Sequence, residues 1–277
     1  MHLADHLIKI ALKEDIGSGD VTTDTLIDAS LKGQAVIIAK EPLVTYGIEV
    51  VSRVFNYLDP DVNITPLCSE GEAVNPNDII LELNGRVKSL LLGERTALNF
   101  LQRLSGIATH VNSFVKELGN RNVRLVDTRK TTPGWRVLEK AAVRAGGAFN
   151  HRMGLFDGIL IKDNHIAACG GIIKAVNRIK KKMPHLLKIE VEAASLSEVK
   201  DALTAGADII MLDNMDVDRI KEAVAVIDGQ ALVEVSGGVT KQNLLPLADT
   251  GVDIISSGAL THSARAVDIS MRISPIT

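Results

Sequence analysis

Residue types that could bind anions and stabilise cations recur after the apolar runs in the second half of this chain. The basic set offers a guanidinium fork and ammonium groups that suit carboxylates or phosphates; its members are Arg129, Lys130, His151, Arg152 and Lys162. The acidic set could hold a divalent cation or ribose hydroxyls, or stabilise a cationic transition state; its members are Glu190, Glu192 and Asp213. The structural alternatives for individual members are a solvated basic face or structural ion pairs for the cations, and a salt bridge to Lys162 for the acids.

Small residues form a third set, in Ser236-Gly237-Gly238 and Ser257-Gly258. Backbone N–H groups at such turns can cradle a phosphate. The alternative is two tight turns that need glycine for a positive φ. The three sets together predict a site for a ligand that carries phosphate and a second acid, beside a developing positive charge. Phosphoribosyl transfer meets that description.

The elements that must position these residues are short apolar runs separated by amphipathic stretches. The runs begin at Val123, Gly158, Lys188, Ala207, Ala231 and Val252. From Gly158 onward the runs start roughly 20 to 30 residues apart, which predicts repeated βα units and a parallel sheet. Repeated right-handed units can close into a barrel whose active site lies at the carboxyl ends of the strands. Six strands are fewer than the eight of a complete barrel.

Alternation along the strands places polar residues on one face. Glu190 and Glu192 share a face, as do Glu234 and Ser236, and Lys162 lies on the face of Leu160. Both faces of a parallel sheet covered by helices are buried. Repeated charges on one face therefore indicate a polar barrel interior that opens to a ligand, rather than an antiparallel sheet with one solvated side.

The first half is predicted to be a mixed α+β domain. A helix is expected over residues 5–12, and strands are expected within residues 34–44, 61–68 and 71–83. Two helices are expected over residues 90–104 and 107–118, with a break at Gly106.

Composition excludes several classes of protein. The formal net charge of -3 argues against a nucleic-acid binder, which would be basic. Two distant cysteines, Cys68 and Cys169, form neither a disulfide framework nor a zinc motif, so any metal is expected to be Mg²⁺ that arrives with a phosphate ligand. No signal peptide or membrane span is expected, which favours a cytoplasmic protein.

Several longer motifs, in order, resemble the quinolinate phosphoribosyltransferase family. The specific ones are DTRKTTPGWR at residues 127–136 and NHRMGL at residues 150–155. Further matches lie at residues 14–24, 93–109, 161–165, 190–192, 212–214 and 234–238. The resemblance runs nearly from end to end.

The resemblance implies an N-terminal α/β sandwich domain at residues 1–106, joined by a C-terminal tail at 266–277. It implies an open six-stranded parallel α/β barrel at residues 107–265, which accounts for the count of six strands. It also implies a homodimer with a shared active site, or a higher oligomer built from it, in which Arg95 enters the barrel of the partner. Residue spacing alone would make Arg95 a helix-surface arginine.

The resemblance also assigns roles. Arg95, Thr128, Arg129, Lys130, His151 and Arg152 resemble the pocket for the dicarboxylate quinolinate. Lys162 lies between the acid and the phosphate ligands. Glu192 and Asp213 match positions beside the ribose hydroxyls and Mg²⁺-bound pyrophosphate, and the phosphate cradle matches Ser236, Gly237, Gly238 and Gly258. Lys130, Lys162, Glu192 and Asp213 are the expected catalytic residues, and Glu192 and Asp213 the expected metal ligands, directly or through substrate or water.

The implied reaction is a decarboxylating pentosyl transfer in NAD biosynthesis. Quinolinate and phosphoribosyl pyrophosphate would give nicotinate mononucleotide, CO2 and pyrophosphate, with no nucleic-acid or membrane partner. Three alternatives stay open from the residues alone. They are a paralogue acting on another nitrogen heterocycle, a Schiff-base aldolase that uses Lys162, and a phosphosugar-binding protein that has lost its chemistry.

Overall fold

The computed structural model describes residues 2–276, and it divides into two compact units. Within the described residues, the first unit comprises residues 2–112, 131–147 and 263–276. The second comprises Ser113–Lys130 and Ala148–His262. Residues 131–147, which the sequence places in the second domain, thus cluster with the first unit.

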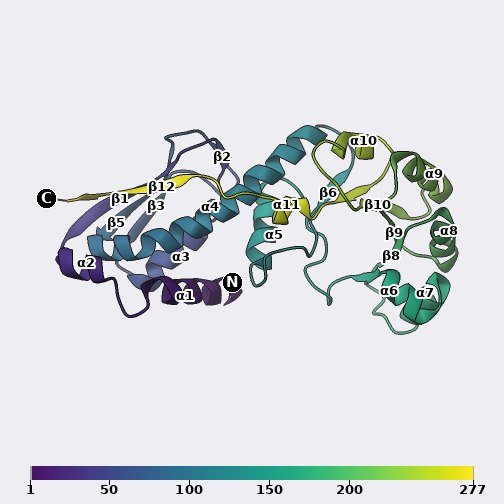
Figure 1. The fold of residues 1–277 in the computed structure, drawn as a ribbon, viewed down its shortest axis with the longest axis horizontal. Coiled ribbons are helices and arrows are strands. Elements are labelled where there is room, and N and C mark those ends of the chain that lie inside the picture. The colour runs from purple at the N-terminus through teal and green to yellow at the C-terminus, as the bar shows by residue number, and fades with distance from the viewer. Residues whose placement is uncertain (1, 277) are drawn as a thin grey trace. The chain divides into compact units, whose positions relative to one another are not determined.

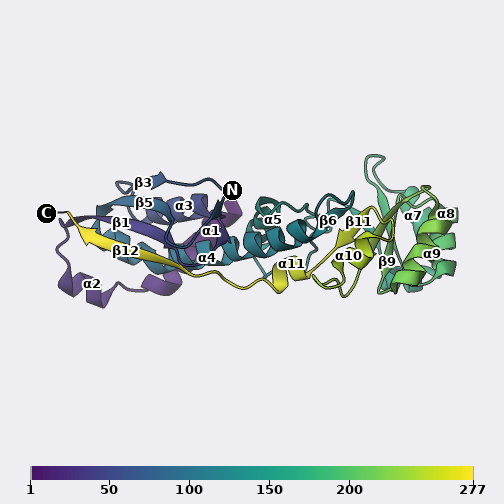
Figure 2. The ribbon, with the colours of Figure 1, turned by 90° about the horizontal axis from the view of Figure 1, so that it is seen from above.

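The first unit is built on an antiparallel sheet of four strands in the order β12-β1-β5-β3 (Figures 1 and 2). A two-stranded pair, β2-β4, and helices complete the unit. The strands are β1 (Lys32–Ala39), β2 (Leu43–Val44), β3 (Asn63–Pro66), β4 (Ala73–Val74), β5 (Ile79–Arg86) and β12 (Ile269–Pro275). The helices are α1 (His2–Ile16), α2 (Val21–Leu26), α3 (Ile48–Leu58), α4 (Val87–Leu118) and α5 (Arg136–Ala145).

The C-terminal strand β12 pairs with β1, in a register that sets Ile37 opposite Met271. The side chains of Ile37 and Met271 are buried. The tail that the sequence expects to pack on the first domain therefore adds an edge strand to the sheet of that unit.

Helix α4 is continuous, so the predicted break at Gly106 is wrong. A Cβ atom at Gly106 would lie 2.1 Å from the carbonyl oxygen of Arg265. The glycine therefore allows the backbone of the C-terminal segment to approach the helix, and it does not end the helix. Glycine inside a helix costs roughly 0.5–1 kcal/mol relative to alanine, which the other residues of a long helix can offset.

The second unit confirms the six strands predicted from the sequence. They form one parallel sheet in the order β6-β11-β10-β9-β8-β7. The strands are β6 (Arg124–Val126), β7 (Ile159–Ile161), β8 (Ile189–Ala193), β9 (Ile209–Asp213), β10 (Leu232–Ser236) and β11 (Ile254–Ser256). The helices of this unit are α6 (Asp163–Cys169), α7 (Ile172–Lys180), α8 (Leu196–Ala205), α9 (Val217–Ile227), α10 (Leu244–Ala248) and α11 (Ala259–His262).

Two acidic residues on separate strands of this sheet meet on one of its faces. Glu190 on β8 and Glu234 on β10 are separated by the intervening strand β9, so their backbones in a flat sheet would lie roughly 10 Å apart. Their carboxylate oxygens nevertheless lie within 4.8 Å of each other. The six parallel strands, connected by helices and not closed between β6 and β7, form an open α/β barrel, with these acidic residues on one face of its sheet.

Among the residues that the structure describes, no helix combines the length and the apolar character needed to cross a lipid bilayer.

Candidate active site

The C-terminal ends of the six parallel strands carry most of the predicted site residues. The ends of β7 and β8 are joined by an ion pair in which Lys162 Nζ lies 2.7 Å from Glu192 Oε2. The Lys162 side chain is 48% exposed and that of Glu192 is 14% exposed. A lysine ammonium and a carboxylate that the sequence assigns to chemistry are thus in contact at the rim.

Asp213 ends β9, and its neighbour Asn214 links it to the end of β10. Asn214 Nδ2 donates to Asp213 Oδ2 over 2.9 Å, and the Asn214 N–H donates to the carbonyl of Ser236 over 3.0 Å. Asn214 has a φ of 53°, an αL conformation that asparagine tolerates better than most residues. The sequence motif Leu-Asp-Asn did not reveal this linking role.

The glycines after β10 need their freedom for two reasons. Gly237 and Gly238 have φ values of 94° and 58°. A Cβ atom on Gly237 would also lie 2.2 Å from Asn214 Oδ1. The turn is therefore one that needs glycine for positive φ, and at Gly237 also for the close approach of Asn214.

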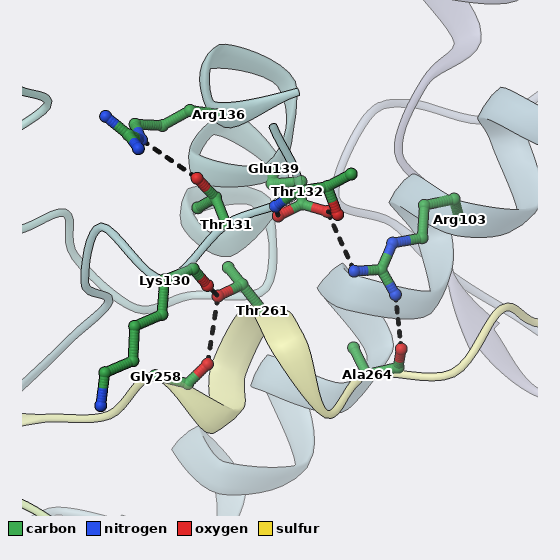
Figure 3. A network of polar contacts seen from close by, with 9 residues as sticks. All are labelled: Arg103, Lys130, Thr131, Thr132, Arg136, Glu139, Gly258, Thr261 and Ala264. Carbon is green, nitrogen blue, oxygen red and sulfur yellow. Dashed lines mark hydrogen bonds and ion pairs between the residues drawn. The ribbon is translucent and has the colours of Figure 1, made fainter. Parts of the chain in front are cut away.

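The end of β6 is tied to the turn after β11. The Thr261 hydroxyl donates to the carbonyl of Lys130 over 2.7 Å and to that of Gly258 over 3.1 Å (Figure 3). A Cβ atom on Gly258 would lie 2.8 Å from Lys130 Cδ. Gly258 therefore makes room for the Lys130 side chain, and the Thr128 hydroxyl accepts from the Lys130 N–H over 3.1 Å.

Asp127, directly after β6, anchors residues 150 and 151, although the sequence did not single it out as a site residue. This buried carboxylate accepts from the His151 N–H over 2.9 Å and from Asn150 Nδ2 over 2.6 Å. Arg152 Nη1 donates to the carbonyl of Gly158 over 3.0 Å. Partial burial, and then the neighbouring Arg129 cation, lower the pKa of Arg152 from its ordinary value. A substrate carboxylate placed there would relieve the repulsion between the two guanidinium groups.

Below the rim, His151 meets two buried carboxyl groups. Its Nε2 lies 3.1 Å from Glu190 Oε2 and 3.6 Å from Glu234 Oε1. Burial, and then the adjacent Glu190 carboxyl, raise the pKa of Glu234 to about 7. The strand pattern put both glutamates on the inner face but did not predict that they meet, because that contact depends on how side chains from separate strands turn toward each other.

The rest of the DTRKTTPGWR motif is held in the first unit. The buried Glu139 accepts from Arg103 Nη2 over 2.9 Å and from the Thr132 hydroxyl over 2.8 Å (Figure 3). Arg103 Nη1 in turn donates to the carbonyl of Ala264 over 2.5 Å. The conformation of the motif after Lys130 thus depends on a buried ion pair that is local to this unit.

Arg95 lies on α4 in the first unit and is exposed.

Known proteins match the chain over nearly its whole length. Residues 20–105 match the family described as "Quinolinate phosphoribosyl transferase, N-terminal domain", and residues 107–272 match its C-terminal domain. A Bacillus subtilis (strain 168) protein named probable nicotinate-nucleotide pyrophosphorylase (carboxylating) is 43% identical over 94% of this chain and 90% of its own length. A protein of the same name from Synechocystis is 46% identical over 95% of this chain and 90% of its own.

Solved structures agree with these sequence matches. NadC from Streptococcus pyogenes is 41% identical and superposes with a TM-score of 0.95, covering 99% of this chain and 97% of that one. The nicotinate-nucleotide pyrophosphorylase from Francisella tularensis is 42% identical with a TM-score of 0.93, covering 99% and 96%. The chain belongs to the quinolinate phosphoribosyl transferase family.

Proposed function

We propose that this chain is the decarboxylating quinolinate phosphoribosyltransferase of NAD biosynthesis, a pentosyltransferase. It transfers the phosphoribosyl group of phosphoribosyl pyrophosphate to quinolinate and yields nicotinate mononucleotide, CO2 and pyrophosphate. The observation that carries the proposal is the ion pair of Lys162 with Glu192 at the carboxyl ends of adjacent strands. It brings a cation suited to an acid substrate next to a carboxylate suited to a cationic transition state. An ammonium group paired in this way is a poor nucleophile, which argues against a Schiff-base aldolase.

In this proposal the dicarboxylate lies among the basic side chains after β6 and β7. Thr128, Arg129, Lys130 and Arg152 bind it on one side and Lys162 on the other, with His151 below. A homodimer would complete the pocket with the partner subunit's Arg95. The proposed location of the protein is the cytoplasm. Burial and then the neighbouring Arg129 cation lower the pKa of Arg152, and the contribution of Arg129 supports an anion at this place.

The phosphoribosyl group lies along the ends of β8 to β11. Glu192 and Asp213 bind the ribose hydroxyls, and the phosphate lies on the backbone of Ser236, Gly237, Gly238 and Gly258. The positive φ angles of Gly237 and Gly238 support this assignment, because such turns aim successive N–H groups at an anion.

The residues present also fit Mg²⁺. Glu192 and Asp213 offer carboxylate oxygens, which are the ligands that Mg²⁺ takes, and they leave most of its coordination shell to water and substrate phosphates. When bound, Mg²⁺ supplies charge neutralisation for the departing pyrophosphate.

The protein groups then act mainly by position and charge. Glu192 and Asp213 stabilise the positive charge that develops on the anomeric carbon as pyrophosphate leaves. The pyridine nitrogen attacks that carbon and becomes cationic. The bond from C2 to its carboxylate then breaks and releases CO2, while C2 keeps the electron pair and takes a proton from water. Arg129, Arg152 and Lys162 keep the ring oriented through both steps.

The test incubates the purified chain with quinolinate, phosphoribosyl pyrophosphate and Mg²⁺, and measures CO2 and nicotinate mononucleotide. Equal amounts of both products are expected. The protein should not convert nicotinate, because nicotinate lacks the second carboxylate that the basic pocket binds. Turnover of nicotinate or another heterocycle in preference to quinolinate would contradict the proposal.

A further inference from the structure

Two buried glutamates and a histidine meet on one face of the sheet, below the rim that carries the proposed chemistry. Glu190 is 5% exposed and Glu234 is 1% exposed. One ligating atom of each of the three side chains lies within 4.8 Å of the others. Neither Glu190 Oε1 nor Glu234 Oε1 has a hydrogen-bond partner within residues 2–276. Since neither glutamate has a role in the proposed reaction, their burial needs another explanation.

The backbone fixes the tautomer of the histidine. The Arg152 N–H donates to His151 Nδ1 over 2.8 Å, so Nδ1 is an acceptor and carries no proton. A neutral imidazole then carries its proton on Nε2. That N–H points at Glu190 Oε2, 3.1 Å away.

The same bond argues against a metal ion at this cluster. A metal held by Nε2 of a neutral imidazole would require a proton on Nδ1. That proton would collide with the Arg152 N–H, which already donates to Nδ1. The geometry therefore suits a hydrogen-bonded proton on Nε2.

Stability alone does not account for the two carboxyl groups. Two ionised carboxylates so close together repel each other, and one proton shared between them relieves that repulsion. Replacing buried ionisable groups with apolar residues of similar volume is often neutral or stabilising. Groups whose replacement would not lower stability are good candidates for a functional role.

The contacts lead from the glutamates to Arg152. Glu190 accepts from one ring nitrogen of His151, and the other ring nitrogen accepts from the Arg152 N–H. Asp127 holds the His151 N–H, and Gly158 accepts from the Arg152 guanidinium. The orientation of the imidazole therefore determines where the Arg152 backbone lies.

We propose that Glu190 and Glu234 are positioning residues. Glu190 accepts the His151 Nε2–H, Glu234 lies 3.6 Å from the same nitrogen, and together they hold the ring and thereby place Arg152 for the acid substrate. The proposal rests on the function proposed above, in which Arg152 binds quinolinate. It predicts that loss of the two carboxyl groups weakens quinolinate binding selectively.

The test compares two double variants with the parent chain. Glu190→Leu with Glu234→Leu removes the hydrogen-bond acceptors and keeps a similar volume. Glu190→Gln with Glu234→Gln keeps acceptor oxygens without the charge. The leucine pair should raise KM for quinolinate by about tenfold or more, with KM for phosphoribosyl pyrophosphate within about twofold and Tm unchanged or higher. The glutamine pair should stay within about threefold of the parent in both KM values.

Two matched measurements complete the design. Glu222→Gln, at an exposed position on α9, controls for the loss of a carboxylate elsewhere in this unit. The ¹⁵N chemical shifts of His151, assigned by their loss in His151→Gln, report the tautomer without any substrate. They should show a proton on Nε2 and none on Nδ1 at pH 7.5.

An unchanged KM for quinolinate in the leucine pair would overturn the proposal, and so would a proton on Nδ1 of His151. If the leucine pair does not fold, the loss of stability would contradict the argument that the carboxyl groups serve positioning. If the parent chain does not convert quinolinate, the proposed function fails, while the tautomer still tests the hydrogen-bond arrangement by itself.

Discussion

Lys162 Nζ lies 2.7 Å from Glu192 Oε2, so the lysine proposed to contact the acid and the carboxylate proposed to contact the ribose contact each other. Each charge partly neutralises the other before substrate arrives. Because the Lys162 side chain is 48% exposed, solvent screens the pair, and such a pair contributes roughly 0–1 kcal/mol to stability. Substrates that bind on either side of this pair must offer each residue a replacement partner.

The first prediction is that Lys162 and Glu192 act together. Lys162→Ala should lose most of kcat/KM, because it removes a substrate contact and leaves Glu192 without its cation. Glu192→Gln should also lose most of kcat/KM. Steady-state kinetics of the two single variants and the double variant measure this. The factor by which the double variant loses kcat/KM should be well below the product of the factors for the two single variants. Independent, multiplicative losses would contradict joint action.

The second prediction concerns the guanidinium of Arg152. Arg152→Ala should lose most of kcat/KM, and Arg152→Lys should not restore it, because lysine cannot reproduce the planar fork. One hydrogen bond to a charged group is worth roughly 1.5–3 kcal/mol, which corresponds to a loss of about 10- to 150-fold. Kinetics with quinolinate varied at saturating phosphoribosyl pyrophosphate would measure this loss of kcat/KM. Full activity of the lysine variant would contradict a role for the planar guanidinium.

The third prediction separates close contact from backbone strain in the proposed phosphate cradle. Gly237 and Gly229 have φ values of 94° and 71°, but a Cβ atom would meet Asn214 at Gly237 and nothing within 4 Å at Gly229. Gly237→Ala should therefore raise KM for phosphoribosyl pyrophosphate strongly. Gly229→Ala, the matched control, should lower Tm slightly and leave both KM values unchanged. Equal effects of the two substitutions on KM for phosphoribosyl pyrophosphate would mean that Gly237 is needed only for the backbone conformation of the turn.

The fourth prediction tests whether two chains share a site. Inactive Arg95→Ala and Lys162→Ala chains are mixed in equal amounts and allowed to exchange subunits. Random pairing gives half heterodimers with one intact site of two, so about a quarter of the parent activity should return. If subunit exchange is verified and no activity returns, each site is built from one chain.

The fifth prediction follows from Glu234. The pKa of this carboxyl is raised to about 7 in the folded protein, from an ordinary value of 4.5. The folded state therefore holds the proton more tightly than the unfolded state, so the contribution of Glu234 to the free energy of unfolding falls as pH rises from about 4.5 to about 7. The slope is at most about 1.4 kcal/mol per pH unit.

Chemical denaturation of the parent and of Glu234→Gln across this pH range measures the effect. The glutamine side chain cannot titrate, so the variant should gain stability relative to the parent as pH rises. A constant difference between the two proteins would show that Glu234 does not titrate in this range.

Local sequence patterns were sufficient for the parallel sheet. Strand spacing predicted β6 to β11, and alternation placed Glu190, Glu192 and Glu234 on one face, as their contacts in the structure require. These inferences succeed because parallel strands bring their carboxyl ends to one edge and alternate side chains to one face.

Contacts between distant segments were beyond the local patterns. Gly106 has the sequence signature of a helix break, but it is small because the backbone of Arg265 approaches it. The meeting of His151 with Glu190 and Glu234 joins a loop and two separate strands, so no single strand encodes it. The roles proposed for Arg95 and for the ligands of each subsite came from the family resemblance, because charge and spacing do not distinguish one anion from another.

The central claim is that anion-binding cations and cation-stabilising acids form a single site at the end of the six-stranded sheet. A crystal structure with quinolinate and an unreactive analogue of phosphoribosyl pyrophosphate tests it most directly. The account predicts the two carboxylates within hydrogen-bond distance of Arg152 and Lys162, the ribose beside Glu192 and Asp213, and the phosphate on Gly237 and Gly238. Quinolinate bound away from Arg152 and Lys162, or a phosphate away from the turn after β10, would contradict it.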